Sequence, residues 1–177
     1  EYSVGVNNKD GGVAEIVKYN KDNNKFYLVN GSTNPPSIDI VSLQQANGVL
    51  SKEDSIDVKS LAERDGFTFG DLTSVAIDRV NKRIYVAVQE ADHMKDGMIL
   101  ALDYDGEYIS HYRAGAQPDM ITVTADGHYV LTADEAEARD GVNDPKGSVT
   151  IVNTATGSSQ QLYFTDGSII DDHVHIR

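Results

Sequence analysis

Short apolar segments separated by turn-forming residues follow one another along most of the chain, and they recur in units. Each unit contains a strand, a turn, a second strand, a loop, a third strand and a turn into a fourth strand. The third strands begin at Ser37, Gly97 and Gly147, roughly 50–60 residues apart. Four short antiparallel strands recurring every ~40–50 residues are typical of β-propeller blades, and inserted loops explain the longer spacing here.

The expected strands are rich in β-branched and aromatic residues, and polar turns such as Asp-Gly bound them. They are Val13–Tyr19, Lys25–Asn30, Ser37–Leu43, Leu72–Asp78, Arg83–Val88, Gly97–Tyr104, Glu107–Arg113, Met120–Thr124, His128–Ala133, Gly147–Asn153 and Gln160–Phe164. Three of them (KFYLVN, RIYVAV and HYVLTA) are apolar on both faces, which suits middle strands covered by neighbouring blades. One short helix is a candidate at Ser55–Asp65.

We therefore predict an all-β fold built from β-propeller blades. Residues 1–10 would be a strand of a preceding blade, 11–69, 70–115 and 116–164 three blades, and 165–177 the start of the next segment. A β-sandwich or jelly roll is the alternative, although neither requires the repeated pattern. A closed propeller needs about 4–8 blades, and three blades leave two apolar faces open. We expect the chain to be an incomplete propeller, completed by the rest of its own propeller or by other chains.

The charge of the chain excludes several classes of partner. Asp and Glu total 28 against 15 Lys and Arg, which gives a formal net charge of -13. Such a surface repels nucleic-acid phosphates and anionic lipid headgroups, and no apolar run is long enough to insert into a membrane. Cysteine is absent, which excludes disulfides, thiolate metal sites and cysteine nucleophiles. Nucleophile-elbow, zincin, Walker and dinucleotide-binding signatures are also absent.

Several segments, in order along nearly the whole chain, resemble the extracellular bacterial propeller family called choice-of-anchor I. They are Gly12–Tyr19, Lys25–Asn30, Ile38–Val41, Leu72–Ala76, Val86–Ala91, Gln117–Met120, Ala133–Glu137, Asp144–Ile151 and Asp171–Arg177. The resemblance implies a seven-bladed type of propeller that is exported and held at the cell surface by varied C-terminal anchors. This chain would cover its N-terminal part. The family's acidic-Gly-acidic-Pro pattern is replaced here by Glu135–Ala138, and the resemblance implies no particular reaction.

The most acidic loop, Asp134–Gly147, is a candidate Ca²⁺ site. Its candidate ligands are Asp134, Glu135, Glu137, Asp140 and Asp144. Ca²⁺ takes 6–8 oxygen ligands, which clustered carboxylates in a Gly-containing loop can supply. The spacing does not match an EF-hand loop, and a solvated acidic loop is the alternative.

Two further carboxylates are candidate metal ligands. Glu90 lies in the equivalent position of the preceding unit, so the two acidic loops are expected on the same side of the disc. Asp119 precedes an inner strand, where its carboxylate either points into the central channel or caps a turn. Near the end of the chain, His173 and His175 are spaced to share one face of a strand. They are a weaker candidate for a transition-metal site.

Two functions remain open from the sequence. The first is a non-catalytic extracellular or cell-surface propeller that binds protein or glycan as an adhesion or assembly module. The second is a Ca²⁺-dependent propeller phosphoesterase, in which acidic loops hold cations that neutralise phosphate and position water. The repeat, the family resemblance and the missing catalytic signatures favour the first.

Overall fold

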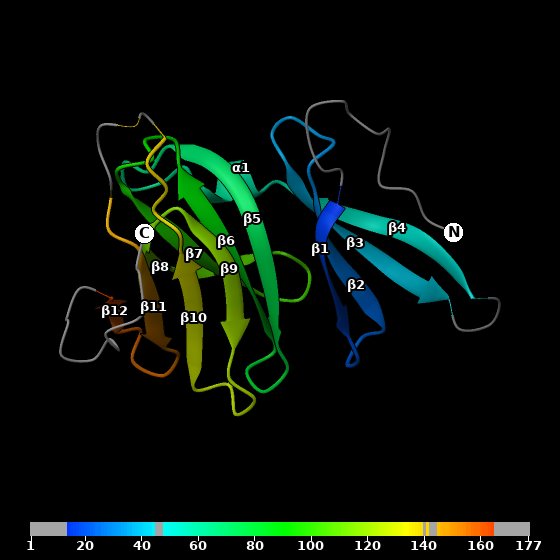
Figure 1. Ribbon diagram of the computed structural model, residues 1–177. Helices are drawn as coiled ribbons and strands as arrows, with labels where there is room; N and C mark the ends of the chain where they lie inside the picture. Colours follow the sequence, from blue (N-terminus) through cyan, green and yellow to red (C-terminus); the bar gives the residue numbers. More distant parts are fainter. Residues whose placement is uncertain (1–13, 45–47, 140, 142–144, 165–177) are drawn as a thin grey trace, which may run out of the picture.

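The computed structural model describes residues 14–44, 48–139, 141 and 145–164. These residues form three four-stranded antiparallel sheets, which Figure 1 shows fanned out in chain order. The first sheet comprises β1 (Ala14–Asn20), β2 (Lys25–Asn30), β3 (Ser37–Gln44) and β4 (Val49–Ile56). The second comprises β5 (Phe69–Asp78), β6 (Arg83–Glu90), β7 (Asp96–Leu102) and β8 (Tyr108–Ala116). The third comprises β9 (Pro118–Val123), β10 (Tyr129–Asp134), β11 (Ser148–Asn153) and β12 (Ser159–Tyr163).

Each sheet pairs its strands in sequence order, as a propeller blade does, and the predicted all-β propeller fold is confirmed. The strand that the sequence pattern did not predict is β4 of the first blade. It is a polar edge strand whose residues are mostly exposed (VLSKEDSI), so it lacks the apolar alternation that marks the others.

The helix between the first two blades is shorter than expected. It is α1 (Val58–Ala62), because Ser55 and Ile56 pair with β3 instead. The Asp57 carboxylate caps it by accepting a hydrogen bond from the backbone N–H of Ser60 at 3.1 Å. No helix in the described ranges has the length and hydropathy needed to cross a membrane.

The innermost strands of the blades, β1, β5 and β9, lie next to one another, as contacts between β1 and β5 and between β5 and β9 show. Because the strands are antiparallel, the connections emerge on two sides of the disc. We call the side with the turns after β1, β5 and β9 the turn side. The opposite side carries the loops after β2, β6 and β10, and we call it the loop side.

Apolar side chains fill the two spaces between the blades. Between the first and second blades, large aliphatic residues pack together, among them Ile40, Val86 and Leu100. Between the second and third blades the packing is closer, with Ala87 and Ala101 against Ile121 and Val130. The second blade thus buries both of its sheet faces, and the first and third each bury one against it. This burial is the main source of stability in such a stack.

The strand registers identify four equivalent positions in each blade that face the next blade along the chain. They are Tyr27, Val29, Ile38 and Ile40 in the first blade, Tyr85, Ala87, Ile99 and Ala101 in the second, and Leu131, Ala133, Val149 and Ile151 in the third. In the first two blades, all are at most 4% exposed. In the third, Ala133 is exposed and the other three are only partly buried. The third blade therefore presents an apolar face that no described residue covers.

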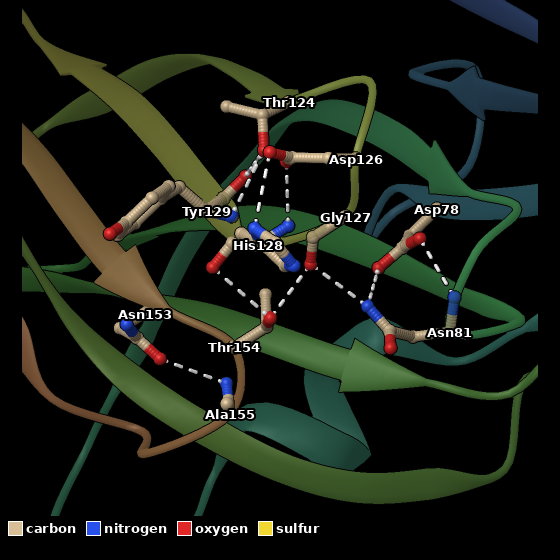
Figure 2. Close-up of polar contacts among 10 residues, drawn as sticks. All are labelled: Asp78, Asn81, Thr124, Asp126, Gly127, His128, Tyr129, Asn153, Thr154 and Ala155. Carbon is tan, nitrogen blue, oxygen red and sulfur yellow. Dashed lines mark hydrogen bonds and ion pairs between the residues drawn. The ribbon is translucent and has the colours of Figure 1, made fainter.

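A hydrogen-bond network on the turn side joins the second blade to the third (Figure 2). The Asn81 amide donates to Asp78 Oδ2 at 2.7 Å and to the carbonyl oxygen of Gly127 at 2.9 Å. The same carbonyl accepts a 2.7 Å hydrogen bond from the Thr154 hydroxyl, which also donates to the carbonyl of His128 at 3.1 Å. Asn81 of the β5–β6 turn and Thr154 of the β11–β12 turn thus both bind the Gly127–His128 backbone of the β9–β10 turn. These contacts fix the relative position of the two blades.

Candidate functional site

A single buried residue joins the two acidic loops on the loop side. Gln117 is the whole connection between β8 and β9, is 2% exposed and has a φ of 54°, in the left-handed region. Its side-chain amide donates to the carbonyl oxygen of His93 at 3.3 Å and to that of Glu137 at 2.8 Å. Its own carbonyl accepts a 3.0 Å hydrogen bond from the Glu135 N–H. The loops after β6 and β10 are therefore held together through Gln117.

Three of the predicted site residues come together beside this junction. The pKa of Glu135 is raised by partial burial and by the negative charges of Asp119 and Glu137, while Arg139 acts in the opposite direction. The Arg139 guanidinium is itself held by a 2.9 Å hydrogen bond to Gln89 Oε1. We call Asp119, Glu135, Glu137 and Arg139 the loop-side cluster. Its exposed carboxylates and guanidinium offer hydrogen-bond acceptors and donors to a ligand.

Asp134 lies apart from this cluster, on the face of the third blade that packs against the second. It is 3% exposed, and its carboxylate accepts hydrogen bonds from the hydroxyls of Thr132 at 2.8 Å and of Ser148 and Thr150 at 2.7 Å each. Burial raises the pKa of Asp134, although the three hydroxyls favour the charged form. These contacts occupy both carboxylate oxygens with groups of its own blade.

Glu90 is also held by its surroundings. It is 8% exposed, and its Oε1 accepts a 3.2 Å hydrogen bond from the Asp92 N–H, so it shapes the loop after β6. It lines a groove of about 570 Å³ at the edge of the second blade, together with Phe67, Met98 and Tyr112. A groove of this volume is within the range of small-molecule sites.

The remaining predicted ligands, Asp140 and Asp144, lie outside the described residues, as do His173 and His175. Among the residues that the structure describes, no group of three or more His, Asp or Glu side chains could hold a metal ion. The Ca²⁺ site therefore stays a prediction.

The sequence pattern missed Gln117 and Gln89. A glutamine between two strands carries no visible signal, because its role depends on loops that are distant along the chain. The Asn30-Gly31-Ser32 glycosylation sequon is visible in the sequence, but Asn30 is 3% exposed and its amide donates to Asp39 Oδ2 at 3.0 Å. The folded blade thus shields this asparagine from modification.

Several solved structures have a similar fold at low sequence identity. The periplasmic gluconolactonase PpgL of Pseudomonas aeruginosa is 16% identical with a TM-score of 0.54, and the match covers 84% of this chain and 38% of that one. The Dos1 propeller is 10% identical with a TM-score of 0.51, covering 82% and 33%. TolB from Acinetobacter baumannii is 15% identical with a TM-score of 0.50, covering 86% and 32%. At these identities the likeness shows the fold alone, and the chain spans less than two fifths of each of these proteins.

No curated protein matches the sequence. A family model does match it, over residues 15–174, which is nearly the whole chain and includes all three blades and the loop-side cluster. The family is that of the choice-of-anchor I domain, which is the family that the ordered segments of the sequence resemble. On this match, the chain belongs to the choice-of-anchor I domain family.

Proposed function

We propose that the chain is a three-blade segment of a larger cell-surface β-propeller that acts as a non-catalytic binding and assembly module. Membership of a choice-of-anchor family indicates a cell-surface protein. In this proposal, further blades cover the open face of the third blade, and the loop side binds protein or glycan outside the cell.

The open face of the third blade carries the assembly part of the proposal. Leu131, Ala133, Val149 and Ile151 occupy the positions that are buried in the first two blades. On the same face, Met120 pairs with Ala133 and is 51% exposed, and Leu162 pairs with Val149 and is 49% exposed. A contiguous apolar sheet face is characteristic of an interaction surface, and its match to the inter-blade positions favours another blade as its occupant.

The loop-side cluster supports the binding part of the proposal. Gln117 fixes the loops after β6 and β10 against each other before any ligand arrives, which lowers the entropic cost of binding. The cluster's carboxylates and guanidinium are planar groups suited to the hydroxyls and amides of a glycan or protein. A net charge of -13 makes a polyanionic partner unfavourable.

Thiol labelling of the full-length protein tests the assembly. Ala133→Cys places a thiol on the open face, Ala155→Cys places one on the exposed β11–β12 turn, and Ala101→Cys places one at a fully buried position. If a further blade covers the third, a maleimide reacts with Ala133→Cys about as slowly as with Ala101→Cys in the native protein. Labelling as fast as that of Ala155→Cys, in a variant with an unchanged unfolding temperature, contradicts the assembly.

Binding to isolated cell-surface material tests the loop side. In the full-length protein, combined Asp119→Asn, Glu135→Gln and Glu137→Gln changes remove the charges of the cluster while keeping side-chain size. We expect the bound fraction to fall about tenfold or more, which corresponds to about 1.4 kcal/mol. Asp105→Asn, at an exposed position in the β7–β8 turn on the turn side, is the matched control. Equal binding by the triple variant and the control would show that the cluster is not the site.

A further inference from the structure

A hollow on the turn side lies where the three innermost strands approach one another. It consists of two adjoining cavities of about 260 and 430 Å³, which share Ile77, Arg79 and Val123. The smaller cavity is also lined by Lys18 and Tyr19 of β1 and by Ile121 and Thr122 of β9. Residues from β1, β5 and β9 thus enclose one space close to the axis around which the blades are arranged. We call it the axial hollow.

Lys18 stands at a position where the other blades need no charge. Its β-ladder partner is Tyr27, and the equivalent pairs are Ala76 with Tyr85 and Thr122 with Leu131. The packing of a blade is therefore satisfied by alanine or threonine at this point. The packing of the blade therefore gives no reason for a lysine at this position.

The Lys18 ammonium is also unusual in its electrostatic surroundings. The Lys18 residue is partly buried and lines the smaller cavity together with Ile77, Ile121 and Val123, and in the described part of the chain no carboxylate lies within ion-pair distance of its ammonium. By contrast, Lys25 and Lys52 each have a carboxylate within 2.8 Å. The Lys18 ammonium therefore has no carboxylate partner among the described residues, and an anion bound in the hollow would supply one.

A second cation is fixed at the edge of the hollow. The Nε and Nη2 atoms of Arg79 both lie 2.8 Å from Asp22 Oδ1, and Asp22 Oδ2 accepts a 2.9 Å hydrogen bond from the Tyr104 hydroxyl. A guanidinium has five N–H donors, so this anchored side chain retains donors for a second acceptor. The remaining acid of the lining, Asp78, accepts hydrogen bonds from Val80 N, Asn81 N and the Asn81 amide within its own turn.

We propose that the axial hollow is a binding site for a small anion that carries a carboxylate or phosphate group. Lys18 supplies a compact positive charge inside the hollow, and Arg79 supplies directed N–H donors at its edge. Ile77, Ile121 and Val123 form the apolar wall, which strengthens the electrostatic attraction by excluding water. Lys18 lines the smaller cavity, and Arg79 lines both; the larger cavity, which adjoins the smaller one, is within the volume range of small-molecule sites. This site is separate from the loop-side cluster and from the open blade face.

Titration calorimetry of the full-length protein at low ionic strength tests the proposal, with inorganic phosphate and succinate as the two probes. We expect saturable binding of at least one of them. Lys18→Ala, which installs the residue found at the equivalent position of the second blade, should weaken that binding about tenfold or more. Lys21→Ala, in the exposed turn after β1, is the matched control and should change the Kd by less than about twofold.

The outcomes separate the sources of the anion and the alternatives. Binding of phosphate alone identifies a phosphorylated ligand, and binding of succinate alone identifies a carboxylate. Lys18→Gln removes the charge but keeps a polar side chain that is only one atom shorter, so a loss of binding with an unchanged unfolding temperature assigns the effect to charge. The proposal is overturned if neither anion gives saturable binding at millimolar concentration, or if Lys18→Ala and Lys21→Ala bind equally well. The thiol-labelling result does not depend on either outcome.

Discussion

Gly115 in β8 is a point of close approach between the second blade and the third, and an added methyl group there has a calculable effect. A Cβ atom at this position would lie 2.4 Å from Ser148 Oγ and 2.5 Å from Asp134 Oδ2. Both atoms belong to the buried network around Asp134, so neither can move away without breaking a hydrogen bond. The Gly115 N–H donates to Thr150 Oγ1 at 2.9 Å within the same network.

The expected cost of Gly115→Ala combines two effects. Overpacking a well-packed interior costs about 1–3 kcal/mol, and weakening the hydrogen bond to Thr150 costs about 1 kcal/mol. Alanine also lowers the conformational entropy of the unfolded chain, which offsets this loss of stability by about 0.4–1 kcal/mol. We therefore expect the free energy of unfolding to fall by about 2 kcal/mol. With an m-value of about 2 kcal/mol/M, the urea midpoint measured by far-UV circular dichroism falls by about 1 M.

Gly147→Ala is the matched control, because its Cβ would meet only the carbonyl oxygens of Asp134 and Glu135 at 3.5 Å, an ordinary contact. Its free energy of unfolding should stay within about 0.5 kcal/mol. Adding Ser148→Ala to Gly115→Ala removes one of the two clashes, so a double-mutant cycle should show that the pair is less harmful than the sum. The reasoning is refuted if Gly115→Ala is no more destabilising than Gly147→Ala.

Three further predictions concern titration and the loop junction. Burial raises the pKa of Asp134 in the folded state. Its contribution to stability is therefore largest below the ordinary carboxyl pKa of about 3.9 and declines as the pH rises through the raised value. In urea titrations, the stability advantage of the native protein over Asp134→Asn should shrink from acid to neutral pH. Burial, and after it the hydrogen bond to Asp22, raises the pKa of Tyr104 to about 12. The stability that the protonated Tyr104 hydroxyl contributes is therefore lost only as the pH rises above about 10 and through 12. Tyr104→Phe should remove one late-titrating phenol from the ultraviolet titration. Gln117→Ala should lower the free energy of unfolding by about 1–2 kcal/mol and speed hydrogen exchange in both the loop after β6 and the loop after β10. Faster exchange in one of these loops alone would contradict the role of Gln117 as their common support.

The apolar middle strands were predictable from the sequence because their side chains are buried on both faces. Tyr27 and Tyr85 occupy equivalent positions in KFYLVN and RIYVAV, and both are fully buried. The edge strand β4 was not predictable, because it has one neighbour and mostly exposed side chains, so solvent rather than packing determines its composition.

The candidate site was predictable only in part. The sequence indicates two acidic loops after equivalent strands, and the structure joins them through Gln117. It also places Asp134 in the last position of β10, where the alternation from Val130 through Thr132 directs its side chain toward the second blade. That alternation was present in the sequence, but the adjacent acidic residues made Asp134 resemble part of the loop. Lys18 carries no local signal in the sequence, because its difference from the alanine and threonine of the other blades depends on the strand register.

The two connections between blades differ in how they would respond to tension along the backbone. Residues 57–68, with α1, join the first blade to the second, whereas Gln117 alone joins the second to the third. Tension along the backbone would be taken up first by the longer connection, where extra chain can be drawn out. The single-residue connection has no slack, so the second and third blades would transmit force as one rigid unit until their hydrogen bonds fail together.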